Sequence, residues 1–157
     1  MSRARRPTTP GAITSAVTAA VAAAVEPDVT AFEAAVLELA TMDAEQVHVV
    51  LGWALREQLE RAHPDGLDAD DLRDAVASAA RAATWWPRLE PQLLVVVVTG
   101  ALGAHDLAET MDAASPALTL GHALLLLTSL LPPPPDPGPT LRSALAEVRR
   151  AELTEMP

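Results

Sequence analysis

The four histidines are the side chains of this sequence best suited to proton transfer near neutral pH, because an imidazole titrates close to pH 6.5. His122 lies inside a strongly apolar segment, so a buried ring there must find hydrogen-bond partners. His48 falls on the polar side of a predicted helix, and His63 falls at a helix end, where the helix dipole favours the protonated ring. We therefore select His122 as a candidate ligand or partner contact and interpret His48 and His63 as structural.

Motifs that would hold a metal or activate a nucleophile are missing from the sequence. His105 and Glu109 would share one face of a helix beside Asp106, but neither a His-Glu-x-x-His nor a Glu-x-x-His pattern occurs. The aspartates between residues 65 and 74 lack the glycine and the final glutamate of a calcium loop, so we interpret them as helix caps. No glycine-rich phosphate loop or nucleophile elbow is present. We expect no catalytic site, no metal and no cofactor; an enzyme would need its histidines and acids to meet in a cleft.

Composition favours helices over sheets. Half of the residues are hydrophobic, but only 3% are aromatic, and alanine, leucine and valine supply most of the apolar side chains. Small and unbranched side chains suit closely packed helices, whereas sheets favour β-branched and aromatic residues. The absence of cysteine excludes disulfides, thiolate metal sites and cysteine nucleophiles.

The charge of the chain is strongly negative and unevenly placed. The formal net charge is -10, and residues 26–112 carry seventeen acids against five arginines. A body of this charge repels a phosphate backbone, so we expect no nucleic-acid partner. The N-terminus is instead basic, with Arg3, Arg5 and Arg6, and we interpret these arginines as part of a solvated tail.

Apolar periodicity and capping residues predict an all-α fold, a compact bundle of about five to seven helices formed by residues 10–131. The firmest helix begins after Asp43 and carries an apolar stripe over four turns. The sequence His63-Pro64-Asp65-Gly66 ends that helix, and Asp68 caps the next one, which is predicted to reach Trp86. Because the loop is short, we expect these two helices to lie side by side as an antiparallel hairpin.

Two strongly apolar segments, residues 90–104 and 117–131, are predicted to be buried helices. Four consecutive valines in the first segment would also suit a strand, but no second β-rich segment exists to pair with it. Each segment has a helical length of roughly 22 Å, against about 30 Å for a bilayer core. Membrane association is therefore the less favoured alternative. Another alternative is a small-molecule or lipid pocket of several hundred Å³ between the two helices, with His122 as its polar contact.

The two ends of the chain differ from the predicted bundle in amino-acid composition. Residues 1–9 are predicted to be a flexible basic tail, residues 132–139 a Pro-rich linker, and residues 140–157 a C-terminal helix and tail. The C-terminal helix has an apolar side that includes Leu141, Leu145 and Val148, and it either folds back on the bundle or docks on a partner. Residues 1–24 have the outline of a signal peptide, which would imply export; we favour an alanine-rich helix capped by Thr9 and a cytoplasmic protein.

Two tryptophans either pack against other helices of the bundle, which we favour, or cover a second interface. Trp53 and Trp85 do not fall on the main apolar stripes of their helices, and large amphipathic rings are common in interfaces. Together with the C-terminal helix on a proline spacer, they favour a non-enzymatic protein that works by protein–protein association. Such a protein would be an adaptor, regulator or assembly subunit that binds a protein partner or a second copy of itself.

Overall fold

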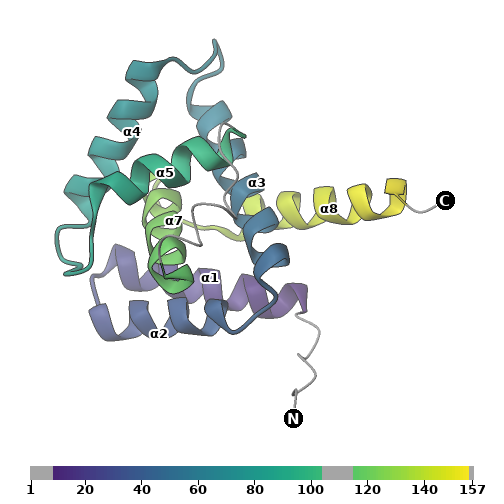
Figure 1. Ribbon diagram of the computed structural model, residues 1–157, viewed down its shortest axis with the longest axis horizontal. Coiled ribbons are helices and arrows are strands. Elements are labelled where there is room, and N and C mark those ends of the chain that lie inside the picture. The colour runs from purple at the N-terminus through teal and green to yellow at the C-terminus, as the bar shows by residue number, and fades with distance from the viewer. Residues whose placement is uncertain (1–8, 104–114, 156–157) are drawn as a thin grey trace.

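The computed structural model describes residues 9–103 and 115–155, and these residues form helices without any strand (Figure 1). The helices are α1 (Pro10–Val25), α2 (Val29–Ala40), α3 (Ala44–Ala62), α4 (Ala69–Ala82), α5 (Pro91–Ala101), α7 (Pro116–Leu130) and α8 (Gly138–Glu155). The prediction of an all-α bundle is confirmed, and the valine-rich segment is a helix. None of the helices in the described residues combines the length and the apolar character needed to cross a bilayer.

Side-chain caps fix where several helices begin. Thr9, Asp28 and Asp43 each accept a hydrogen bond from the backbone N–H three residues later, at 3.2, 3.0 and 2.9 Å. Asp68 and Asp71 form a reciprocal capping box at the start of α4, with distances of 2.8 and 3.1 Å. Each of these bonds satisfies an N–H group that has no partner inside the helix. The capping roles predicted for Thr9, Asp43 and Asp68 are therefore confirmed.

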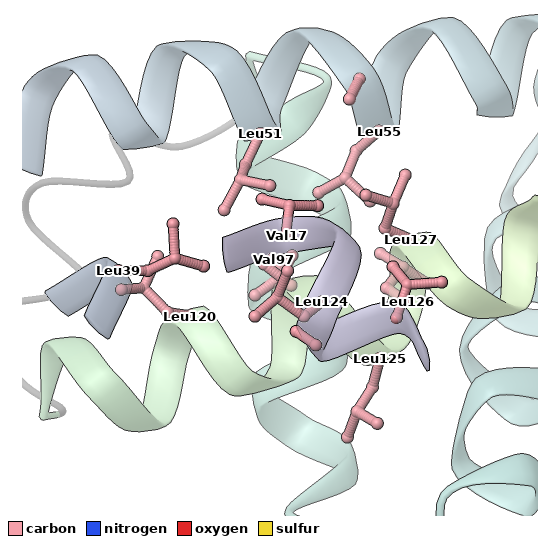
Figure 2. Close-up of a cluster of buried hydrophobic side chains, with 14 of the residues drawn as sticks. Val17, Leu39, Leu51, Leu55, Val97, Leu120, Leu124, Leu125, Leu126 and Leu127 are labelled. Carbon is pink, nitrogen blue, oxygen red and sulfur yellow. The ribbon is translucent and has the colours of Figure 1, made fainter. Parts of the chain in front are cut away.

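Helix α7 is the centre of the bundle. It packs against α1, α2, α3, α4 and α5, and every residue from Thr119 to Leu127 is buried. Figure 2 shows its leucines among Val17 of α1, Leu51 and Leu55 of α3, and Val97 of α5. A helix that is apolar on all sides is stable in water only when it is enclosed. The segment predicted as buried packing material does occupy the interior.

The position of α4 corrects the predicted hairpin with α3. Helix α4 packs against α5 and α7, and its contact with α3 is at most slight. Gly66, with a φ of 107°, reverses the chain after α3, and the extended residue Asp68 then leads into α4 along another direction. The position of α4 is thus set by its packing against α5 and α7, and the short loop after α3 does not force the two helices to lie side by side.

Three helix boundaries also differ from the predicted ones. Helix α4 ends at Ala82 rather than near Trp86, because Pro87 disfavours helical geometry at Trp86, which sits in a turn bonded to Ala83. Helix α5 ends at Ala101, ahead of a glycine with positive φ at position 103. Helix α8 begins inside the predicted linker, at Gly138, since a proline is tolerated in the first turn of a helix.

Only the first half of α8 is anchored on the bundle. Thr140, Leu141 and Ala144 are buried, and α8 packs mainly against α3. The Thr140 hydroxyl donates to the Glu57 carboxylate of α3 at 3.3 Å. Further along, α8 extends away from the body of the molecule toward the C-terminus (Figure 1). The helix folds back on the bundle, which is one of the two predicted alternatives. Val148 still packs partly against the core, and the residues of α8 beyond it are exposed.

Trp86 and Gly121 form a close contact between the end of α4 and α7. The Trp86 indole is 3% exposed, donates through Nε1 to Glu33 at 3.3 Å, and meets the rings of Phe32 and His122 at centroid distances of 5.3 and 5.0 Å. A Cβ on Gly121 would lie 2.5 Å from Cη2 of this indole. The backbone of α7 therefore approaches the indole so closely that only glycine, which has no Cβ, fits at position 121.

We predict that Gly121→Ala destabilises the fold by about 1–3 kcal/mol, because the added methyl overpacks a ring that is held on several sides. This loss should exceed the gain of up to about 1 kcal/mol that alanine brings to a helix interior. Urea denaturation followed by circular dichroism measures the effect. The matched control is Gly52→Ala in α3, where no atom lies within 4 Å of the added Cβ and a small gain in stability is expected. Equal effects of the two substitutions would contradict the steric argument.

Candidate functional site

The His122 imidazole joins α7 to the start of α5. Its Nδ1 lies 2.7 Å from the Leu118 carbonyl oxygen, and its Nε2 accepts the backbone N–H of Glu90 at 2.9 Å. Because a carbonyl oxygen cannot donate, Nδ1 carries the hydrogen, and the ring is neutral. Glu90 is the N-cap residue of α5 and provides no side-chain cap, so His122 supplies the missing acceptor. A side chain selected for chemistry thus caps a helix from a distance.

The environment of His122 favours structure over catalysis. The ring is fully buried, and both nitrogens are engaged by the backbone. Burial lowers the pKa of His122, although the Leu118 carbonyl and the nearby Glu90 act in the opposite direction. No ring nitrogen is left free for a ligand or a substrate.

The side of α3 that periodicity predicts to be polar, on which His48 lies, is partly covered in the fold. The side chain is half-buried, its Nε2 is buried without a hydrogen-bond partner, and burial lowers the pKa of His48 while a hydrogen bond with the Ala44 backbone acts to raise it. The reason is tertiary: α5 and α7 cover this side of α3, which local periodicity cannot show.

A small cavity lies between α3, α5 and α7, in the region where the ligand-binding alternative places its pocket. Its volume is about 20 Å³, and its lining consists of His48, Leu51, Gly52, Leu55, Val97, Thr119, Leu120 and Ala123. A cavity of this size has room for one water molecule. It is far smaller than the several hundred Å³ that the alternative expects.

Acidic and histidine side chains of the described residues do not gather into a metal site. Within residues 9–103 and 115–155, no group of three or more such side chains is placed to hold a metal ion. His63 Nδ1 lies 3.5 Å from Asp71 Oδ1, and this contact joins the end of α3 to the first turn of α4. His105, Asp106 and Glu109, which share a predicted helix face, lie outside the described residues.

The two selected tryptophans have different environments. Trp85 is half-buried, and its ring meets the Phe32 ring edge to face at a centroid distance of 5.3 Å. It therefore contributes to the packing of its own chain. Trp53 is 40% exposed on α3. It lies seven residues after Gln46 and four before Glu57, and this spacing places all three on one side of the helix. That side borders α8, because Glu57 bonds to Thr140.

A groove runs along α8 and includes Gln46 in its lining; we call it the α8 groove. Its volume is about 790 Å³, and it is lined by Pro10 of α1, Gln46 of α3 and, from α8, Arg142, Leu145, Ala146, Val148, Arg149, Arg150, Glu152 and Leu153. The predicted partner contacts Leu145 and Val148 are both in this lining and are half-buried. The third, Leu141, is instead fully buried and anchors the helix.

Comparison with known proteins gives no relative on which to rest a function. No family model, curated protein or solved structure matches this chain. The geometry of the described residues is therefore the basis for a functional proposal.

Sequence reasoning missed part of the α8 groove. Pro10 and Gln46 come from chain segments far from α8, and only folding brings them to it. The arginines did carry a signal: Arg142, Leu145, Arg149 and Leu153 follow one another at spacings of three, four and four residues, so they form one stripe along the helix. Attention to the apolar side alone left this basic stripe unnoticed.

We predict that the protein loses stability as the pH falls below about 6.5. His48 and His122 have lowered pKa values in the fold, so the unfolded chain binds more protons in the window from 6.5 down to these lowered values. The stability that their neutral forms provide is complete above pH 6.5 and declines through that window. Urea denaturation between pH 7.5 and 5.5 measures the decline.

The contribution of each ring can be separated by substitution. His48→Leu should reduce the slope of unfolding free energy against pH, because it removes one group that must stay neutral in the fold. A slope unchanged by this substitution, together with a flat profile for the wild type, would show that the two rings do not govern acid sensitivity.

Proposed function

We propose that this chain is a non-enzymatic helical protein that works by binding a protein partner through the α8 groove and the adjoining face of α3. The supporting observation is the shape of α8, an eighteen-residue helix buried only in its first half and bordered by a groove of about 790 Å³. An extended groove beside a projecting helix suits a macromolecular partner, since helix-in-groove contacts are a common mode of peptide recognition.

Exposed apolar side chains beside this groove support the same proposal. Leu153 is 67% exposed near the end of α8, and Trp53 and Val49 are 40% and 43% exposed on α3. Tryptophan is among the residues that contribute most to binding energy when a partner covers it. An adaptor, a regulator or an assembly subunit would each use such a surface.

The chemistry of the interior agrees with a binding role. His122, which the sequence predicts as a possible ligand or partner contact, has both nitrogens occupied by backbone groups. His48 faces a cavity that holds at most a water molecule rather than a substrate. The support for a binding role therefore comes from the surface of the protein. The interior histidines described above are engaged in packing and hydrogen bonding within the fold.

The test is to compare association by the wild-type chain with association by a Trp53→Ala, Leu153→Asp double variant. The tagged protein is exposed to extract of its native host, bound proteins are quantified, and sedimentation equilibrium measures self-association. We expect the double variant to lose at least about tenfold in affinity, because a hot-spot residue contributes about 2 kcal/mol or more.

Leu37→Asp is the matched control, because Leu37 is 59% exposed on α2, which does not contact α8 appreciably. It should bind as the wild type does. A strictly monomeric chain that captures nothing, or a loss of binding that is equal in the control and the double variant, would refute the proposed function.

A further inference from the structure

The α8 groove carries more arginines than acids, on a chain that is acidic overall. The chain has a net charge of -10, yet the groove contains three arginines, Arg142, Arg149 and Arg150, against one acid, Glu152. A local reversal of sign favours partners of the opposite charge and disfavours others, because complementary potentials guide association.

Two of these arginines are available for a partner. Arg150 is paired with Glu147 at 2.6 Å. Arg142 and Arg149 are exposed and form no ion pair within the described part of the chain. They lie seven residues apart on one helix, which separates them by roughly 10 Å along its axis. The groove therefore presents two arginines without an ion-pair partner among the described residues, with backbone positions about 10 Å apart.

Apolar side chains alternate with these guanidinium groups. Leu145 lies between Arg142 and Arg149, and Leu153 follows Arg149 by one turn. An occupant complementary to this stripe has carboxylates about 10 Å apart with an apolar side chain between them. A helix with acids seven residues apart and a leucine midway has this spacing, because its pitch equals that of α8.

We propose that the α8 groove binds an acidic, amphipathic helical segment of a partner protein, with carboxylates on Arg142 and Arg149 and an apolar side chain on Leu145. Guanidinium groups suit this role because they bind carboxylates through two parallel hydrogen bonds. A nucleic acid is disfavoured, because Leu145 and Leu153 of the groove have no apolar counterpart on a phosphate backbone. This inference rests on the proposed function and specifies its partner.

The test uses a fluorescein-labelled, alanine-based helical peptide with two glutamates seven residues apart and a leucine midway. Fluorescence anisotropy with the full-length chain should show saturable binding that weakens as salt is added. Replacement of both glutamates by glutamine, or Arg142→Gln with Arg149→Gln in the protein, should each weaken binding roughly tenfold. Arg81→Gln with Arg88→Gln is the control, because it changes the net charge equally on exposed arginines outside the groove.

A charge exchange distinguishes direct pairing from a general charge effect. The Arg142→Glu, Arg149→Glu variant should reject the glutamate peptide and bind the version with arginines in the two positions. Circular dichroism confirms that each variant is folded. Equal binding of the glutamate and glutamine peptides, no peptide binding, or preference for a labelled single-stranded oligonucleotide would each overturn the acidic partner. If the Trp53 and Leu153 substitutions still abolish association in that case, the proposed function stands with a partner of different chemistry.

Discussion

The whole fold depends on enclosing one helix that has no polar side. Helix α7 has nine consecutive buried residues, so an arrangement that left any face of it in water would lose a large part of the hydrophobic free energy. Five other helices meet this requirement together, and each of them needs only one apolar stripe to do so. The amphipathic sequences of α2, α3 and α4 are therefore best understood as parts of a shell around α7.

Enclosure of α7 determines how its few polar and small residues are used. A buried imidazole is tolerated at position 122 because two backbone groups satisfy it, and in return it caps α5. Gly121, its neighbour, lets the Trp86 indole lie directly on the helix backbone. The two adjacent residues thus bind the turn before α5 to the centre of the bundle, one through hydrogen bonds and the other through shape.

The sequence predicts what depends on neighbours along the chain and fails where distant segments meet. Asp43 and Asp68 mark helix starts because capping involves only the next three residues. The environment of His48 depends on α5 and α7, so its helical position alone misplaces it. Leu145 and Val148, predicted as partner contacts from the pattern of one helix, line the α8 groove, whereas Gln46 comes from a helix nearly a hundred residues earlier and reaches the groove only through the fold. The spacing of Arg142 and Arg149 along one helix face can be read from the sequence. That they line a groove becomes known only from the fold.

The partial anchoring of α8 has a consequence for how its outer end keeps its shape. Starting a helix is the costly step, whereas adding one residue to an existing helix is nearly neutral. The buried turn around Leu141 provides the start, and the residues beyond it can remain helical by simple continuation. A surface shaped in this way before any encounter loses little conformational entropy on binding. The interior packing of Leu141 therefore stabilises the helical backbone several turns away, where the side chains make no contact with Leu141.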